Sequence, residues 1–221
     1  MTNGIVKNNL LHVQKEIAPY TPRIIAVTKY YDISAILDAY DAGLRDFGES
    51  RANDAIKKIE SLPENVRQDS NFHFIGHLQT NKVDRVVRYF DYIQSVDSLY
   101  LAEAISASAI KNGKIQKIFL QVNISREVQK FGFEERDLKE SINDIKNLQN
   151  LEIVGLMCMA PFGADESELN KVFSSAKELK EKLNDEYDLN LTELSMGMSD
   201  DYKVAVRNGA TMIRVGRLLF N

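Results

Sequence analysis

Short apolar segments alternate with amphipathic segments along the chain, and this alternation constrains the fold more than any other feature. The apolar segments are rich in β-branched and aromatic residues, which is typical of strands. They lie at residues 23–28, 45–48, 72–76, 91–96, 117–124, 151–159, 191–196 and 211–216. Alternating strands and helices favour parallel strands joined by right-handed crossovers, and eight such units predict a closed (β/α)8 TIM barrel of the α/β class.

The amphipathic segments repeat their apolar residues at helical spacing. They lie at residues 33–43, 49–62, 80–90, 97–113, 134–148, 166–185 and 200–210, and the residues before 20 predict an extra N-terminal helix. Three of these helices begin at a side chain that commonly accepts a hydrogen bond from the first turn, namely Asp32, Thr80 and Asp97. Three end at a glycine suited to the left-handed conformation, namely Gly43, Gly113 and Gly209.

An open doubly wound sheet is the alternative arrangement for alternating strands and helices. Such sheets commonly carry a glycine-rich turn after a strand, but neither G-x-G-x-x-G nor G-x-x-x-x-G-K-[ST] follows a predicted strand in this chain. The chain also has no proline- or serine-rich linker, no internal repeat and no low-complexity tract. We therefore expect residues 1–221 to form a single domain.

Composition argues against several functional classes. The chain has 28 Lys and Arg residues against 32 Asp and Glu residues, and a net charge of −4 argues against nucleic acid as the main partner. Charged residues make up 27% of the chain, which is too many for a bundle of membrane helices. The single cysteine, Cys158, forms no internal disulfide, and no Cys/His cluster has zinc-ligand spacing. Because no signal peptide is evident either, we expect a cytoplasmic protein without a metal site.

One lysine lies directly after an apolar strand, at the edge where a TIM barrel carries its functional site. Lys29 follows the segment IIAVT. Partial desolvation at such a strand end favours the neutral amine, which makes a lysine a nucleophile for carbonyl groups. The alternative is a lysine that only extends from the strand end into solvent. Position alone leaves both interpretations open.

The last predicted strand ends in a turn that suits a phosphate group. Gly216 permits a close approach of the backbone, and the turn into LLF presents free N–H groups where barrels often bind phosphate. Ser199, beside the predicted helix 200–210, adds a hydroxyl donor. A glycine needed for packing and a serine helix cap are the alternative interpretations. Together with Lys29, this pattern is compatible with pyridoxal 5′-phosphate, which carries both an aldehyde and a phosphate.

Eight stretches of the chain, in order from about residue 23 to its end, resemble the pyridoxal-phosphate homeostasis protein family. They are RIIAVTKYY, DFGESRANDAIKK, FHFIGHLQTNK, IQSVDS, LQVNIS, VGLMCMAP, LSMGMSDDYKVAVRNGATMIRVG and the terminal LLF. The resemblance implies the fold-type III barrel of the alanine racemase N-terminal domain and a covalently bound pyridoxal phosphate cofactor. It also implies a role in intracellular vitamin B6 homeostasis, as a buffer or carrier without established catalytic turnover.

The resemblance implies roles for two basic residues. Lys29 would hold the cofactor as a Schiff base, and Arg214 would face the pyridine nitrogen. A guanidinium is always protonated and has no acceptor, so Arg214 can only donate to that nitrogen. An unprotonated pyridine is a weaker electron sink than a pyridinium paired with a carboxylate, which suits a carrier or a restrained racemase.

The resemblance also places five further residues around the cofactor. Ser199, with the backbone of Gly216 and Arg217, would hold the phosphate, and Met196 would line the ring pocket. Ser50 stands where family members usually have Asn after FGE, so a contact to the ring or its hydroxyl would be shortened or replaced by water. Arg217 stands where they commonly have Thr or Ser, so the backbone donor would remain while a hydroxyl contact to the phosphate would be lost.

The leading hypothesis is therefore a non-catalytic pyridoxal phosphate carrier, a monomer whose partners include apo-enzymes that require the cofactor. The first alternative is a pyridoxal-phosphate-dependent racemase or decarboxylase of the same barrel type. Such enzymes need a second acid–base group, commonly a tyrosine of a C-terminal β-domain, and we expect that domain to be absent because the chain ends at Asn221. The second alternative is a cofactor-free barrel that binds phosphate, such as a class I-like aldolase.

Four other residues are weaker candidates. His73 and His77 flank the third predicted strand and are interpreted as structural or surface residues. Cys158 lies within a strand and is interpreted as an inert core thiol. Lys130 lies in the loop after the fifth strand and is interpreted as solvated.

Overall fold

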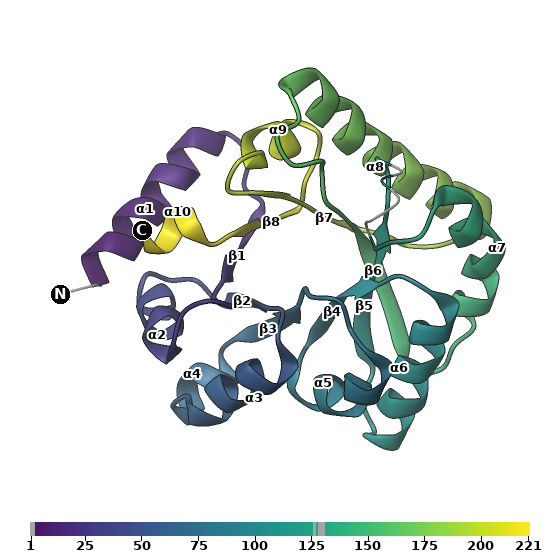
Figure 1. The fold of residues 1–221 in the computed structure, drawn as a ribbon, viewed down its shortest axis with the longest axis horizontal. Coiled ribbons are helices and arrows are strands. Elements are labelled where there is room, and N and C mark those ends of the chain that lie inside the picture. The colour runs from purple at the N-terminus through teal and green to yellow at the C-terminus, as the bar shows by residue number, and fades with distance from the viewer. Residues whose placement is uncertain (1–2, 126, 128–130) are drawn as a thin grey trace.

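Eight parallel strands close into a barrel in the computed structural model, which describes residues 3–125, 127 and 131–221. Lys130 lies outside the described residues. The strands follow one another around the barrel in sequence order (Figure 1), and β8 pairs with β1. They are β1 (Arg23–Val27), β2 (Asp46–Glu49), β3 (Asn71–Phe74), β4 (Tyr92–Val96), β5 (Gln116–Val122), β6 (Leu151–Cys158), β7 (Glu193–Met198) and β8 (Met212–Val215). The predicted TIM barrel is confirmed.

Helices surround the barrel on its outer side (Figure 1). They are α1 (Asn3–Ile17), α2 (Ile33–Asp41), α3 (Ala52–Ser61), α4 (Glu64–Gln68), the 3-10 helix η1 (Thr80–Lys82), α5 (Val83–Tyr89), α6 (Leu99–Lys111), α7 (Glu135–Lys146), α8 (Glu166–Tyr187), α9 (Tyr202–Arg207) and α10 (Arg217–Phe220). The predicted N-terminal helix is α1, which lies beside α10 from the other end of the chain. Asn9 joins the two helices, because its Nδ2 donates to the backbone oxygens of Leu219 and Asn221 at 3.2 Å each.

Some predicted helix boundaries are wrong. The segment 49–62 begins as the end of β2, and α3 starts only at Ala52. The segment 80–90 consists of η1 followed by α5. The five-residue helix α4 was not predicted, because a segment that short shows no helical periodicity.

The predicted helix ends are partly confirmed. Asp32 caps α2 by accepting the N–H of Ser34 at 2.9 Å. The predictions for Thr80 and Asp97 are wrong, because Thr80 is already the first residue of η1 and Ser98 is the residue that caps α6. The three predicted glycine ends have the positive φ that favours glycine, with 101° at Gly43, 62° at Gly113 and 90° at Gly209.

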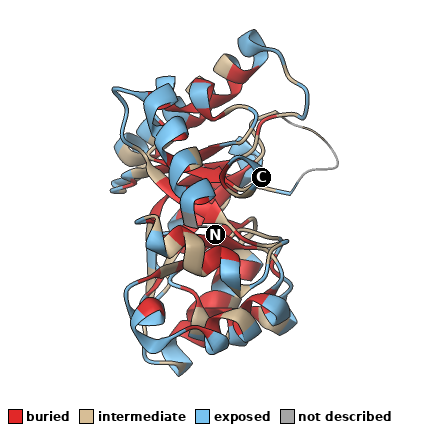
Figure 2. Ribbon diagram, turned by 90° about the vertical axis from the view of Figure 1, so that its left-hand side faces the viewer, coloured by how far each residue is buried: buried red, intermediate tan, exposed pale blue. Residues whose placement is uncertain are grey.

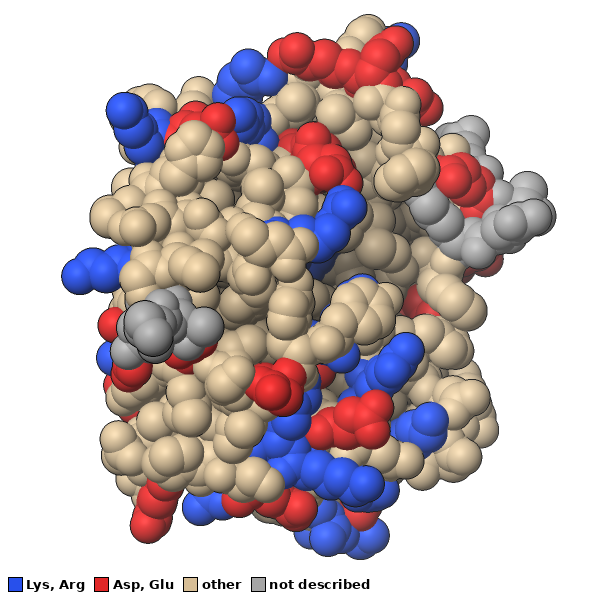
Figure 3. Space-filling view, turned by 60° about the vertical axis from the view of Figure 1, so that its left-hand side comes forward, with Lys and Arg blue, Asp and Glu red and all other residues tan. Residues whose placement is uncertain are grey.

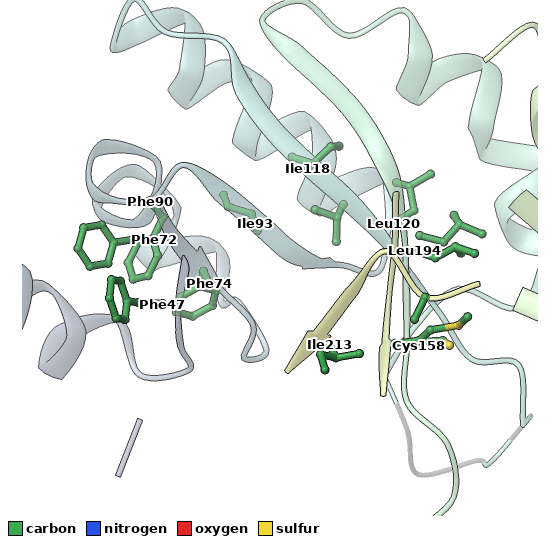
Figure 4. Close-up of a cluster of buried hydrophobic side chains, with 14 of the residues drawn as sticks. Phe47, Phe72, Phe74, Phe90, Ile93, Ile118, Leu120, Cys158, Leu194 and Ile213 are labelled. Atoms are coloured by element: carbon green, nitrogen blue, oxygen red, sulfur yellow. The ribbon is translucent and has the colours of Figure 1, made fainter. Parts of the chain in front are cut away.

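Two hydrophobic layers hold the barrel together, and the alternation of side chains along each strand creates both. Ile24 and Ala26 of β1 belong to the outer layer between strands and helices, whereas Ile25 points into the barrel. Buried residues accordingly form the barrel and the inward sides of the helices (Figure 2). In the outer layer, phenylalanines from neighbouring elements contact one another (Figure 4), and the ring centroids of Phe74 and Phe90 are 5.3 Å apart.

The parallel arrangement brings the carboxyl ends of all eight strands to one end of the barrel. Lys29, Ser50, Ser199, Gly216 and Arg217 follow β1, β2, β7 and β8, whereas Met196 and Arg214 lie within β7 and β8. The residues in the loops therefore share this end of the barrel. No helix in the described part of the chain is long and apolar enough to span a membrane.

Candidate functional site

Lys29 lies in the turn after β1, at the carboxyl end of the barrel. The preceding Thr28 is fully buried, and its hydroxyl donates to Glu49 Oε1 at 2.8 Å. As a residue of the turn that follows β1, Lys29 lies at the mouth of the barrel. Its side chain is half-buried, with Nζ 5.0 Å from the centroid of the Tyr30 ring. Within the described residues, Lys29 forms no ion pair with a carboxylate.

A second lysine holds the turn that carries Lys29. Lys58 of α3 donates from Nζ to the backbone oxygens of Thr28, at 2.9 Å, and Tyr31, at 3.1 Å. The same ammonium pairs with the buried carboxylate of Glu49. These contacts fix the turn on both sides of Lys29. Sequence reasoning missed this function of Lys58 and Glu49, because helical spacing alone did not place Lys58 beneath a strand end.

Arg214 extends from β8 into the barrel and is 4% exposed. Its Nη1 donates to Ser195 Oγ at 2.8 Å, and its Nη2 donates to the backbone oxygen of Cys158 at 3.0 Å. Burial lowers the pKa of Arg214 from its ordinary high value, and the charge of Asp201 opposes that shift. A guanidinium has five N–H groups, so two engaged groups leave donors for a ligand.

The turns after β7 and β8 lie side by side, because these strands are neighbours in the barrel. Gly197 has φ +92°, and a Cβ there would lie 2.6 Å from the Cβ of Ala205, so only glycine suits this position. Asp201 closes the first turn: its N–H donates to the backbone oxygen of Met198 at 3.1 Å. Burial raises the pKa of Asp201. Ser199 lies half-buried within this turn.

Gly216 and Arg217 form the start of α10. A Cβ on Gly216 would lie 3.2 Å from the backbone oxygen of Val27, so this residue brings β8 close to β1. The side chain of Arg217 is 69% exposed and donates to Asp200 Oδ2 at 2.7 Å. These two charged side chains lie at the wall of a cavity of about 380 Å³ that the loop 160–164 also lines. Lys and Arg side chains, with acidic ones between them, border a hollow in the surface shown in Figure 3.

The remaining predicted residues are at different depths. Ser50 lies half-buried after β2, where Gly76 packs against its backbone: a Cβ on Gly76 would be 2.4 Å from Ser50 O. Met196 is fully buried and belongs to the outer hydrophobic layer together with Leu194, on the face of β7 opposite to Ser195. The expectation that the Met196 side chain lines a ring pocket therefore needs correction, because strand alternation turns it away from the barrel interior.

The two histidines differ in their surroundings. His73 is fully buried inside the barrel and lies 2.9 Å from Asp46 Oδ1, so it is a structural residue with a carboxylate partner. His77 stacks on Phe131, with ring centroids 4.0 Å apart. Cys158 is a buried thiol of the outer layer. Among the described residues, no group of three or more His, Cys, Asp or Glu side chains could hold a metal ion.

The family of the chain follows from comparison with known proteins. Residues 4–221 match the family described as alanine racemase, N-terminal domain. The chain is 43% identical over 202 residues to the pyridoxal phosphate homeostasis protein of Synechocystis sp., covering 91% of this chain and 92% of that protein. It is 36% identical over 198 residues to the protein of the same name from Aquifex aeolicus, covering 90% and 86%.

Solved structures agree with these sequence relationships. PipY of Synechococcus elongatus PCC7942, solved with PLP bound, is 38% identical, with a TM-score of 0.89 over 98% of this chain and 100% of that chain. Alanine racemase of Clostridium difficile is 14% identical, with a TM-score of 0.78, and the match covers 56% of its chain, which shows a shared fold. The chain therefore belongs to the alanine racemase N-terminal domain family and, within it, to the pyridoxal phosphate homeostasis proteins.

Proposed function

We propose that this protein binds pyridoxal 5′-phosphate (PLP) covalently through Lys29 and acts as a buffer or carrier in vitamin B6 homeostasis, without catalytic turnover. One observation carries the proposal. Lys29 lies at the mouth of the barrel after β1, and the adjoining strand β8 supplies the buried Arg214, whose guanidinium has N–H groups available for a ligand. The relatives named pyridoxal phosphate homeostasis protein and the PipY structure solved with PLP bound support it.

Residues inside the barrel fit the ring of PLP. Arg214 engages two of its N–H groups with Ser195 and Cys158, which leaves others to donate to the pyridine nitrogen. Ser50, half-buried at the neighbouring strand end, offers a hydroxyl to the ring substituents. Met196 contributes no side chain to this pocket, because it packs in the outer layer.

The turns after β7 and β8 fit the phosphate of PLP. The Ser199 hydroxyl and the backbone N–H groups of Gly216 and Arg217 are donors at this end of the barrel. The carboxylate of Asp200 would repel a phosphate nearby. The ion pair between Arg217 and Asp200 neutralises that carboxylate, which is how an arginine at position 217 supports anion binding while its side chain stays exposed.

The same residues favour holding the cofactor over transforming a substrate. When bound, PLP supplies an aldehyde that condenses with Lys29 Nζ and releases water. Lys58 holds the turn of Lys29 from the side of α3, through the carbonyls of Thr28 and Tyr31. Arg214 would donate to the ring nitrogen without transferring a proton to it, which would leave the ring a weaker electron sink. The site therefore suits a carrier better than a racemase or decarboxylase.

Absorption spectroscopy and peptide mapping test this proposal. Adding PLP to the wild type is expected to produce a new visible band, and borohydride reduction is expected to fix PLP on the peptide that contains Lys29. Lys29→Ala should abolish both signals. Lys57→Ala is the matched control, because Lys57 is an exposed lysine of α3. A wild type without the band in excess PLP, or a reduced adduct on another lysine, would refute the proposal.

The proposal extends to the state of the protein in the cell, as a single-domain cytoplasmic monomer that transfers PLP to apo-enzymes. Light scattering after gel filtration is expected to give the mass of one chain. Transfer is tested with a PLP-free aminotransferase, mixed with the loaded protein or separated from it by a dialysis membrane. Direct transfer predicts faster reactivation on mixing, whereas equal rates would show release into solution.

A further inference from the structure

A continuous chain of hydrogen bonds connects Arg214 with Asp46 through the interior of the barrel. Arg214 Nη1 lies 2.8 Å from Ser195 Oγ, and that hydroxyl lies 2.6 Å from Gln94 Oε1. Gln94 Nε2 lies 2.9 Å from His73 Nδ1, and His73 Nε2 lies 2.9 Å from Asp46 Oδ1. All five side chains are buried, and His73, Gln94 and Ser195 have no exposed surface.

Arg214 and the amide orientation of Gln94 together determine the direction of every bond in this chain. Because a guanidinium only donates, Ser195 Oγ accepts from Arg214 and uses its single hydrogen to donate to Gln94 Oε1. The amide of Gln94 then turns its Nε2 toward His73 Nδ1, which must accept. His73 consequently carries its proton on Nε2 and donates to the carboxylate of Asp46.

Two neighbouring contacts support this orientation independently. The second hydrogen of Gln94 Nε2 faces Met212 Sδ at 3.9 Å, and a thioether sulfur can only accept. Burial lowers the pKa of His73 and so keeps its imidazole neutral, although the charges of Asp46 and Asp91 act in the opposite sense. Arg23 Nη1 lies 3.7 Å from Asp46 Oδ1, so this end of the chain also forms an ion pair.

We infer that Asp46, His73, Gln94 and Ser195 form a one-way relay that positions Arg214 for the pyridine nitrogen of PLP. The relay joins a buried cation to a carboxylate through three neutral groups, so each bond polarises the next one. The relay fixes the position of Arg214 Nη1. Because the guanidinium is planar, this also fixes the directions in which its other N–H groups point. These four are positioning residues, and their role toward PLP rests on the proposed function.

The orientation is tested first in the PLP-free protein, by nitrogen-15 NMR of the histidine rings. His73 is expected to carry its proton on Nε2 and to remain neutral at mildly acidic pH. Gln94→Met removes the amide without touching Arg214, and the relay predicts faster exchange of the Arg214 side-chain N–H groups with water. Gln116→Met is the matched control, because Gln116 is an equally buried glutamine outside the relay. A proton on His73 Nδ1, or equal exchange in both variants, would overturn the inference.

The role toward PLP is tested by the absorption band of the loaded protein. Ser195→Ala is expected to shift the band and to weaken PLP binding about 10-fold, the effect of losing one hydrogen bond to a charged group. Ser195→Thr keeps the hydroxyl and should restore both. Ser95→Ala is the control, because Ser95 Oγ is buried without a partner among the described residues. An unchanged band in Ser195→Ala would overturn the positioning role. If the wild type binds no PLP, the proposed function fails while the NMR result still decides the relay.

Discussion

Replacing Lys58 with methionine tests whether the turn of Lys29 depends on the buried lysine beneath it. The side chain of Lys58 is 14% exposed and that of Glu49 is 1% exposed, so solvent screens their ion pair only weakly. Methionine fills a similar volume but can neither pair with Glu49 nor donate to Thr28 and Tyr31. The variant therefore isolates the loss of charge and hydrogen bonds from the loss of packing.

The expected cost follows from the partners that are left behind. Removing one member of a buried ion pair costs about 3–5 kcal/mol, because the remaining charge stays buried without compensation. In Lys58→Met, Glu49 Oε1 still accepts a hydrogen bond from the hydroxyl of Thr28, whereas Glu49 Oε2 has no hydrogen-bond partner among the described residues. We therefore expect Lys58→Met to lower the free energy of unfolding by about 3–4 kcal/mol.

Urea denaturation of the PLP-free protein, followed by circular dichroism, measures this change. Lys57→Met is the control, because Lys57 is exposed on the same helix. The double variant Lys58→Met/Glu49→Gln has no uncompensated buried charge. Its loss in the free energy of unfolding should therefore be at least about 1 kcal/mol smaller than the sum of the losses in the two single variants. A loss below about 1 kcal/mol in Lys58→Met, or strict additivity in the double variant, would refute the reasoning.

Three further changes test other parts of the structure. Gly76→Ala places a Cβ 2.4 Å from Ser50 O and should cost about 1–3 kcal/mol in urea denaturation. Burial lowers the pKa of His73 in the folded protein, so the unfolded chain binds a proton at His73 more readily. The free energy of unfolding should therefore fall below about pH 6.5, by at most about 1.4 kcal/mol per pH unit. His73→Gln should remove this pH dependence. Arg217→Ala should change the melting temperature little, because its pair with Asp200 is exposed, but should weaken PLP binding in a titration.

The barrel could be predicted from the sequence because its signals are local. Each strand is a short run of apolar residues, and left-handed glycines such as Gly43 and Gly209 mark helix ends within the segments that they close. Lys29 could be identified as well, since its position directly after IIAVT places it at the functional end of any parallel barrel. The boundary errors occur where the local signal is weak, as at α4, which has five residues.

The partners of the site residues could not be predicted, because they come from strands and helices far apart in the sequence. Lys58 is an ordinary helix residue by its spacing, and only the folded structure brings its Nζ to the carbonyl oxygen of Thr28, 30 residues away. Met196 shows the same limit. Resemblance placed it in the pocket, but the alternation along β7 gives the inward position to Ser195.

The charge of Arg214 explains why the interior of this barrel is not purely apolar. Arg214 is 4% exposed and therefore needs hydrogen-bond acceptors, because an uncompensated buried charge costs several kcal/mol. No carboxylate of the described residues forms a hydrogen bond with it. The acceptors are instead a backbone oxygen and the hydroxyl of Ser195, which leads through Gln94 and His73 to Asp46. A carboxylate hydrogen-bonded directly to Arg214 would occupy the donors that a ligand needs. The charge of Asp201 favours the guanidinium without a hydrogen bond to it, so N–H groups of Arg214 remain free to bind.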